Sequence, residues 1–172
     1  MSLDHLAKRI ARQEKDAFAE LYNKTSGIVY SVCLAIVKDK GLAEELTQDS
    51  FVCVWSEINS FRGVGLKTWL LTIARNKVLN ELRKRKREVA VDFSENERLG
   101  GSYDVETSIE TSVLLDLALA KLDVTDRQIV LMKNSGAKMK EIALLLEMPR
   151  GTVSWRYAEA LKILKNYLEV RE

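Results

Sequence analysis

Apolar residues recur along the chain at the three- and four-residue spacing of amphipathic helices. This spacing over residues 3–10 predicts a first short helix. A second helix is expected over residues 16–36, with Asp16 as its N-cap and Gly27 as the point where it could bend. The N-terminal part is therefore predicted to be helical.

Two further helices follow a polar turn at residues 38–41. One covers about residues 42–58. After a loop over residues 59–65, the other runs from Leu66 to near Lys86, and its apolar face is formed by Leu66, Leu70, Ile73, Ala74 and Leu82. Trp69 is expected to belong to the core. Four helices with short connections predict a compact bundle domain over residues 1–87.

Residues 88–108 differ in character from the helices on either side. They are acidic, contain Gly100-Gly101-Ser102 and lack sustained periodicity. Such a composition is typical of a flexible linker. The chain is therefore expected to consist of two domains joined by this segment.

A second small helical domain is predicted over residues 109–172. Thr125 and Gln128 have the spacing of a capping box at the start of one helix, and Gly136 suits its end. Residues 138–164 then have the pattern of a helix-turn-helix, with Pro149 breaking the first helix.

The second helix of this motif has one face for the core and one for a partner. Val153, Tyr157, Ala160, Leu161, Leu164 and Leu168 recur at core spacing. The outward set is Arg150, Thr152, Ser154, Trp155, Arg156 and Glu159. A recognition helix contacts the major groove with such N-terminal residues. The motif is also compatible with a plain helical hairpin, because Lys138 is a poor N-cap and Glu159 is acidic.

Composition supports an all-α protein of two small domains, since 172 residues include only eight glycines and one proline. The net charge of +2 does not indicate a nucleic-acid partner, but the distribution of charged residues along the chain does. Residues 75–87 carry seven bases and one acid, whereas residues 88–111 carry seven acids and one base. A basic stretch beside an acidic one predicts a polyanion-binding surface, although bases near a helix C-terminus are also favourable without a ligand.

Several functional classes lack support in the sequence. One histidine and the distant Cys33 and Cys53 cannot form a metal site, and the two thiols are expected to be buried and reduced. No nucleophile–base pair or phosphate loop points to an enzyme, so no cofactor and no small-molecule substrate are expected. No signal peptide or long apolar run is apparent, so a cytoplasmic protein that is not inserted in the membrane is expected.

The third predicted helix is apolar on two sides, which favours either burial all round or a partner. Phe51 and Trp55 lie beside the polar residues Glu45, Gln48 and Asp49. This combination suits a partner-binding patch. Packing of Phe51 and Trp55 against the first helix explains them equally well.

The fourth helix and the loop before it carry the chemistry of nucleic-acid binding. Arg75, Asn76 and Arg83 lie roughly along one side of the helix, where charge can follow a phosphate backbone. In the loop, Phe61 and Arg62 have the residue types that capture unstacked bases.

Taken together, these segments resemble the extracytoplasmic-function (ECF, group IV) sigma factors of the bacterial sigma-70 family. The resemblance covers nearly the whole chain. It rests on Asp16-Ala17-Phe18 with Leu21-Tyr22, residues 43–51 with Val54-Trp55, Ser60-Phe61-Arg62-Gly63, Thr68-Trp69-Leu70 with residues 73–76, Glu141-Ile142-Ala143 and Gly151-Thr152-Val153.

The resemblance implies a role for each segment. Glu45, Gln48, Asp49, Phe51 and Trp55 would dock on the clamp helices of the largest subunit of core RNA polymerase. Phe61, Arg62, Gly63, Arg75, Asn76 and Arg83 would bind and open the −10 element. Arg150, Thr152, Ser154, Trp155, Arg156 and Glu159 would contact the −35 element, while Trp155 and Glu159 depart from the more basic family pattern.

The implied partners are core polymerase, through its clamp helices and flap, promoter DNA and an anti-sigma factor that could hold the protein at the membrane. The acidic linker would thread the polymerase channel. A helix-turn-helix regulator that does not load polymerase is the alternative, but it does not need the patch from Glu45 to Trp55. A helical adaptor without DNA contact would leave the basic stretch unexplained.

Overall fold

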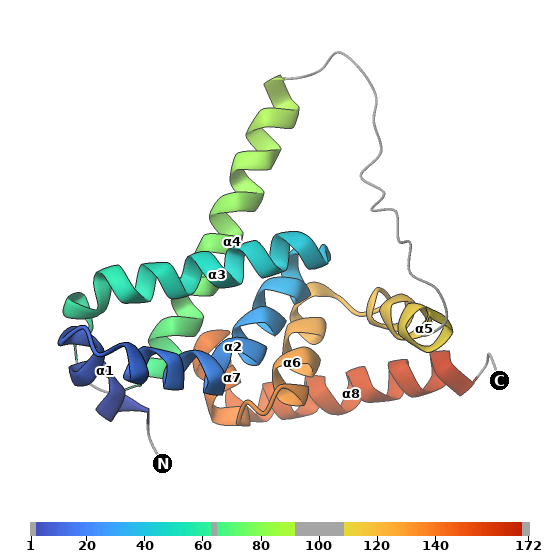
Figure 1. Ribbon diagram of the computed structural model, residues 1–172. Helices are drawn as coiled ribbons and strands as arrows, with labels where there is room; N and C mark the ends of the chain where they lie inside the picture. Colours follow the sequence, from blue (N-terminus) through green and yellow to red (C-terminus); the bar gives the residue numbers. More distant parts are fainter. Residues whose placement is uncertain (1–2, 63–64, 92–108, 170–172) are drawn as a thin grey trace.

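The computed structural model describes residues 3–62, 65–91 and 109–169. Within these ranges the regular elements are helices and no strand occurs, which confirms the all-α prediction. Four α-helices and a short 3-10 helix form the N-terminal half, and four further α-helices form the C-terminal half (Figure 1).

The N-terminal half consists of α1 (Asp4–Ala11), α2 (Lys15–Val37), α3 (Lys40–Glu57), η1 (Ile58–Ser60) and α4 (Leu66–Val91). α2 begins slightly earlier than predicted, with Glu14 rather than Asp16 as N-cap, and it continues through Gly27 without a break. It ends at Lys38, whose φ of 58° is left-handed. Asp39 then caps α3, because its side chain accepts a hydrogen bond from the Leu42 amide at 2.8 Å.

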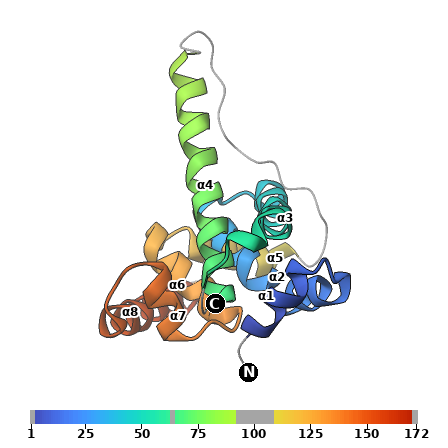
Figure 2. The same cartoon turned by 90° about the vertical axis from the view of Figure 1, so that its left-hand side faces the viewer.

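α4 is the longest helix and it leaves the body of the molecule. Its first half buries Leu66, Leu70, Leu71, Ala74 and Val78 against the other helices. Its second half projects away from the remaining helices (Figures 1 and 2). Because α4 continues to Val91, residues 88–91 of the predicted linker are helical, and residues 92–108 lie outside the described residues.

The C-terminal half consists of α5 (Ile109–Leu119), α6 (Val124–Asn134), α7 (Met139–Leu145) and α8 (Arg150–Glu169). The predicted capping box at Thr125 is wrong. The N-cap of α6 is Asp123, which accepts from the Asp126 amide at 2.7 Å. Gly136 terminates this segment as predicted, with a φ of 91° that favours glycine.

α7 and α8 form the predicted helix-turn-helix. The weak N-cap Lys138 is compensated by Glu141, whose carboxylate accepts from the Lys138 amide at 2.8 Å. On α8, Val153, Ala160 and Leu164 are buried as expected. The core assignment of Leu161 is wrong, because 42% of this residue is exposed on the outer side of the helix.

The two halves pack directly against each other. Helix α6 lies against α2, and one continuous hydrophobic cluster includes Val32 and Leu70 of the N-terminal half together with Ile129, Met132 and Ile142 of the C-terminal half. The described chain is therefore a single body with α4 projecting from it (Figure 2). A search of the described residues for a helix long and apolar enough to cross a bilayer finds none.

Candidate protein and nucleic-acid interfaces

Helix α3 has a side that is polar and exposed. Glu45, Gln48 and Asp49 are exposed. We call these three residues, with the half-buried Trp55, the α3 surface. The opposite side of the helix buries Ala43, Leu46 and Val54, so the surface is carried by a fixed element.

The aromatic residues of α3 pack on α2, not on the first helix. The ring centroids of Phe18 and Trp55 are 5.0 Å apart, and those of Tyr22 and Phe51 are 4.7 Å apart. Phe51 is only 3% exposed, which corrects its assignment to a contact surface. It supports the α3 surface from beneath, and Trp55 alone of the two offers an edge to a partner.

The two cysteines are free thiols at different depths. Cys33 is buried and Cys53 is half-buried. Burial raises the pKa of the Cys33 thiol to about 11. Among the described residues, no group of three or more His, Cys, Asp or Glu side chains gathers in a way that could hold a metal ion.

The described residues on either side of the loop between η1 and α4 are held by one nearby ring contact and by hydrogen bonds to the distant Asp4. The ring of the half-buried Phe61 packs on Trp69, with centroids 5.3 Å apart. The amides of Gly65 and Leu66 donate to Asp4 Oδ1 at 2.8 and 2.7 Å. Asp4 of α1 thus caps α4 from 62 residues away, which local sequence patterns do not reveal.

The predicted −10 residues fall on the loop and on one stretch of α4. Arg62, Asn76 and Arg83 are exposed, and Arg75 is half-buried. The Arg75 Nε atom is buried without a hydrogen-bond partner in the protein. Gly63 lies outside the described residues.

Beyond Asn80, α4 carries consecutive bases that the body of the protein does not cover. Arg85 donates to Glu81 at 2.9 Å, and this carboxylate partly neutralises the charge of Arg85. The remaining exposed bases of the stretch are Arg83, Lys84, Lys86 and Arg87. A projecting helix with this charge is suited to a phosphate backbone.

On α8, some of the predicted −35 residues are exposed, and others are paired with residues of the protein. Arg150, Ser154 and Trp155 are exposed, with Trp155 at 63%. Thr152 is half-buried. Glu159 pairs with Lys162 at 2.7 Å, which offsets the acidic charge on this helix.

Arg156 is held by the protein itself. Its Nε donates to Asp126 at 2.7 Å and its Nη2 donates to Asp123 at 2.6 Å. Burial raises the pKa of Asp123, but hydrogen bonds from the Asp126 amide and from Arg156 outweigh burial and lower that pKa below its ordinary value. The guanidinium therefore fixes α8 to the start of α6, and its assignment to the −35 contact stays a prediction.

Arg127 is a structural residue that the sequence did not single out. It is 4% exposed and donates to three backbone carbonyls, those of Leu119, Ala35 and Leu122, at 3.0, 3.0 and 2.8 Å. Burial lowers the pKa of its guanidinium from the ordinary value. Ala35 belongs to α2, so this side chain joins the two halves.

Comparison with known proteins identifies the same family for both halves of the chain. The family "Sigma-70 region 2" matches residues 21–88, and the family "Sigma-70, region 4" matches residues 112–164. The ECF RNA polymerase sigma factor SigK of Mycobacterium tuberculosis (strain ATCC 25618 / H37Rv) is 30% identical, over 98% of this chain and 94% of the relative. The chain belongs to the ECF RNA polymerase sigma factors. SigK of Mycobacterium sp. (strain JLS) is 29% identical over 96% of this chain.

Solved structures agree with this assignment. The sigma factor RpoE in complex with the anti-sigma factor NepR from Bartonella quintana matches with a TM-score of 0.68 and 26% identity, over 90% of this chain and 98% of that chain. CnrH in complex with the cytosolic domain of CnrY matches with a TM-score of 0.67 and 20% identity, over 97% of each chain, which shows the shared fold. The prediction of a sigma factor is confirmed, and the roles of individual residues stay predictions.

Proposed function

We propose that this sigma factor docks on core RNA polymerase through the α3 surface and directs it to promoters. The observation that carries the proposal is that Glu45, Gln48 and Asp49 face solvent while α3 is fixed on its other side by buried residues. A preorganised polar surface with a central aromatic edge, here Trp55, suits a specific protein interface. We assign the clamp helices of the largest subunit as its partner.

The loop and α4 would then recognise and open the −10 element. Phe61 and Arg62 lie just before α4, and the exposed Asn76 follows on that helix. The half-buried Arg75 on the same helix would add positive charge beside the DNA. Extruding a base from the duplex costs a few kcal/mol, and a site held by the Phe61–Trp69 contact is suited to offset it.

The C-terminal half would contact the −35 element with α8. Exposed Arg150, Ser154 and Trp155 supply side chains for phosphates and bases. The flap of polymerase would hold this half over the DNA. No step in these roles needs an acid, a base or a nucleophile from the protein, so the proposed activity is binding.

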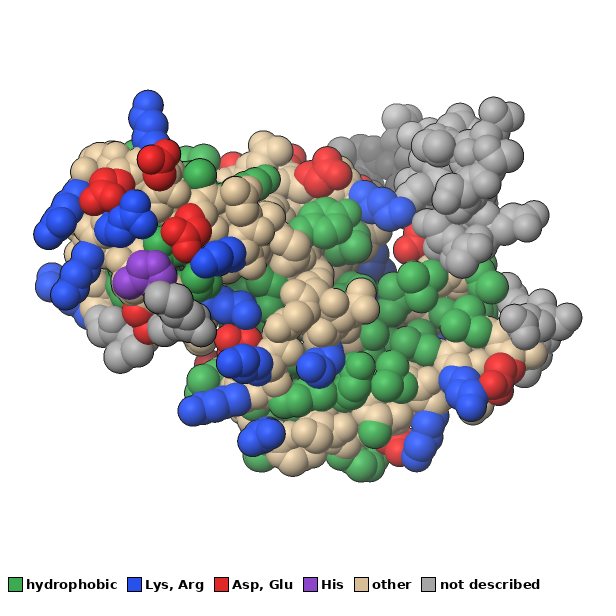
Figure 3. All heavy atoms as spheres, turned by 60° about the horizontal axis from the view of Figure 1, so that its bottom comes forward, with side chains coloured by type: hydrophobic (Ala, Val, Ile, Leu, Met, Phe, Trp, Pro, Cys, Tyr) green, Lys and Arg blue, Asp and Glu red, His purple; other side chains and the backbone are tan. Residues whose placement is uncertain are grey.

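We further propose control by an anti-sigma factor. Large apolar side chains, including Leu115, Leu117 and Leu161, are exposed on the C-terminal helices. Figure 3 shows apolar side chains gathered on the face where these helices come forward. Such a face is typical of protein interaction sites. The similar RpoE was solved in complex with an anti-sigma factor. We place the chain in group IV and in the cytoplasm, with any membrane attachment supplied by that partner.

Assembly with core polymerase tests the proposal against the alternative of a regulator that does not load polymerase. The full chain is mixed with core enzyme of its source bacterium, and complex formation is titrated. We expect a stable complex, and we expect Gln48→Ala with Asp49→Ala to weaken it at least tenfold. The matched control is Asn166→Ala, an exposed change on α8, which is expected to leave assembly unchanged. Absence of a complex with the unmodified chain would favour the regulator.

A further inference from the structure

The first turn of α4 follows a residue that has no side chain to cap it. Gly65 occupies the N-cap position, because its carbonyl oxygen accepts a hydrogen bond from the Trp69 amide at 2.9 Å. Its φ of 95° lies in the left-handed region that favours glycine. Most N-cap residues supply a side-chain oxygen for the amides of the first turn, and glycine has none. A protein acceptor for these amides therefore has to come from another segment.

That acceptor is the carboxylate of Asp4. Its Oδ1 atom accepts from the Gly65 amide at 2.8 Å and from the Leu66 amide at 2.7 Å. These distances are typical of hydrogen bonds to a charged acceptor. A negative charge at this end of α4 is also favoured by the helix dipole. One atom of α1 thus fixes two consecutive backbone amides at the start of α4.

Helix α1 holds this carboxylate in place. Asp4 lies in the first turn of α1, and the apolar side of the helix buries Leu6 and Ile10 completely. Near the other end of the helix, Arg9 donates to Glu14 at 2.8 Å and so ties α1 to the start of α2. Asp4 therefore acts on α4 from a helix that is packed on the rest of the protein.

The start of α4 in turn determines where the ring of Phe61 lies. Trp69 is one turn into α4, and its ring contacts the Phe61 ring with centroids 5.3 Å apart. The Phe61 amide also donates to the carbonyl oxygen of Ile58 at 3.1 Å. Asn76 follows Trp69 by seven residues, about two helical turns, so both lie on the same side of α4. A displaced first turn would move Trp69 and with it the support of Phe61.

We propose that Asp4 is a positioning residue for recognition of the −10 element. It sets the start of α4, and through Trp69 it places Phe61 for contact with an extruded base. The inference rests on the proposed function, in which Phe61 and Asn76 contact this element. A site that is ordered before binding avoids the cost of ordering it on the DNA. Loss of Asp4 should therefore impair promoter opening more than initial binding, which depends mainly on charge.

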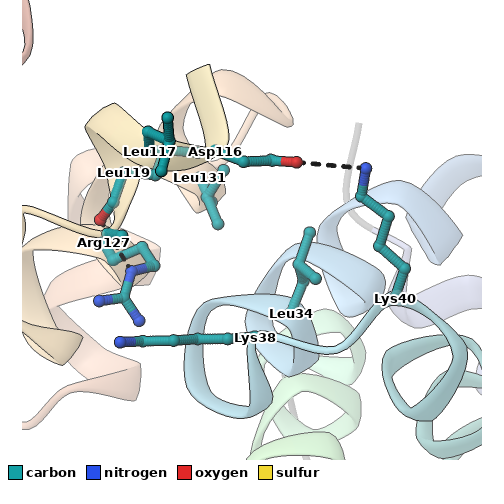
Figure 4. Close-up of a pocket in the computed structure, with 9 residues that line it drawn as sticks. Leu34, Lys38, Lys40, Asp116, Leu117, Leu119, Arg127 and Leu131 are labelled. Atoms are coloured by element: carbon teal, nitrogen blue, oxygen red, sulfur yellow. Dashed lines mark hydrogen bonds and ion pairs between the residues drawn. The ribbon is translucent and has the colours of Figure 1, made fainter. Parts of the chain in front are cut away.

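Two other aspartates provide matched controls. Asp39 is also a helix cap, since it accepts from the Leu42 amide at 2.8 Å, but it caps α3. Asp116 also joins distant segments, because its Oδ2 atom lies 3.4 Å from Lys40 Nζ beside a hollow between α2, α5 and α6 (Figure 4). Among the described residues that line this hollow, none belongs to α4 or to the loop before it. Alanine at either position thus removes a comparable interaction away from the first turn of α4.

Hydrogen exchange in the full chain without polymerase tests the first step. The exchange of the Gly65 and Leu66 amides is followed by NMR. We expect Asp4→Ala to accelerate it by roughly tenfold, because both amides lose their acceptor. Asp39→Ala and Asp116→Ala are expected to leave these two rates within about threefold of the unmodified chain. Equal rates in Asp4→Ala and the unmodified chain would overturn the inference, whatever the effect on transcription.

Promoter opening tests the second step. Each variant is assembled with core polymerase, and the complete holoenzyme is added to a promoter mapped by start-site sequencing. Gel shifts at low temperature report closed complexes, and permanganate footprinting reports the rate of opening. We expect Asp4→Ala to slow opening by roughly fivefold, with less than about twofold change in closed binding. Asp4→Asn keeps an acceptor oxygen and is expected to open the promoter about threefold faster than Asp4→Ala.

The outcomes separate the inference from the proposed function. Both control variants are expected to open the promoter at the rate of the unmodified chain. Unchanged opening by Asp4→Ala, or no recovery in Asp4→Asn, would overturn the inference. Equal losses of closed binding and opening in Asp4→Ala would overturn it as well, since they indicate a general loss of stability. If Phe61→Ala opens the promoter normally, the proposed −10 role fails, and the positioning role of Asp4 fails with it.

Discussion

Arg156 Nε donates to Asp126 Oδ1 at 2.7 Å, so α8, the second helix of the helix-turn-helix, is fixed to the first turn of α6. The same guanidinium also reaches Asp123, the N-cap of α6, at 2.6 Å. One side chain thereby orients α8 and holds in place the two acids that stabilise the N-terminal end of α6. The pattern of the sequence placed Arg156 on the outer side of α8, but it did not reveal the two acids that hold it.

Arg156→Ala is expected to destabilise the C-terminal half. Charge-assisted hydrogen bonds contribute more than neutral ones, and their loss here is expected to cost about 1.5–3 kcal/mol. The free energy of unfolding from denaturant titration measures the change. Arg150→Ala, at the exposed start of the same helix, is the control and is expected to change it by less than ~0.5 kcal/mol. Equal effects of the two substitutions would mean that the ion pairs with Asp123 and Asp126 do not hold α8.

Asn76→Ala is expected to impair promoter opening more than initial binding. The exposed amide lies on α4 beyond the loop that carries Phe61, where a flipped base would be held. Loss of one good hydrogen bond corresponds to about tenfold in open-complex formation. Permanganate footprinting reports open complexes, and gel shifts at low temperature report closed ones. Thr72→Ala, an exposed change one turn earlier on α4, is the matched control, and a parallel loss of both steps would refute the pocket assignment.

The exposed bases of α4 are expected to set the salt dependence of promoter binding. Replacing Arg83 and Lys86 by Gln should reduce the slope of log K against log salt by roughly 1.8, since each phosphate contact contributes about 0.9. The measurement is a salt titration of the holoenzyme on a mapped promoter. Arg85→Gln serves as comparison, because Glu81 already engages Arg85. An unchanged slope in the double variant would support a helix end that carries charge without contacting DNA.

The two cysteines are expected to react at very different rates. A thiol reagent attacks the thiolate, and a pKa of about 11 leaves Cys33 almost fully protonated at pH 8, in addition to its burial. Cys53→Ser should therefore abolish rapid labelling of the folded chain, and denaturant should restore one reactive thiol. The labelling rate of Cys33 should rise as pH approaches 11. Rapid labelling of the Cys53→Ser variant at pH 8 would show that α2 and α3 do not enclose Cys33.

The sequence predicted the helices well because their signals are local. Periodicity at 3–10 and 138–164 and the break at Pro149 each depend on near neighbours, and the structure confirms the helices they indicate. The misassigned cap shows the limit of such signals. Thr125 and Gln128 have capping-box spacing, yet Asp123 supplies the cap, because its Oδ1 accepts the Asp126 amide while its Oδ2 accepts from Arg156.

The features that sequence reasoning missed are contacts between distant segments. Asp4 caps α4 across 62 residues, and Arg127 reaches Ala35 across 92 residues. The neighbouring sequence of Asp4 or of Arg127 does not indicate which distant segment the side chain contacts. Phe51 was placed on the surface for a related reason, since α3 is apolar on two sides and only the packing of Tyr22 shows which side is covered.

The proposed roles of α3, α4 and α8 all depend on this chain directing core polymerase to particular promoters. The direct measurement is transcription of genomic DNA of the source bacterium by core enzyme, with and without the purified protein, followed by sequencing of transcript 5′ ends. We expect a defined set of start sites that appears only with the protein and shares two upstream sequence elements. Identical start sites in both reactions would contradict it.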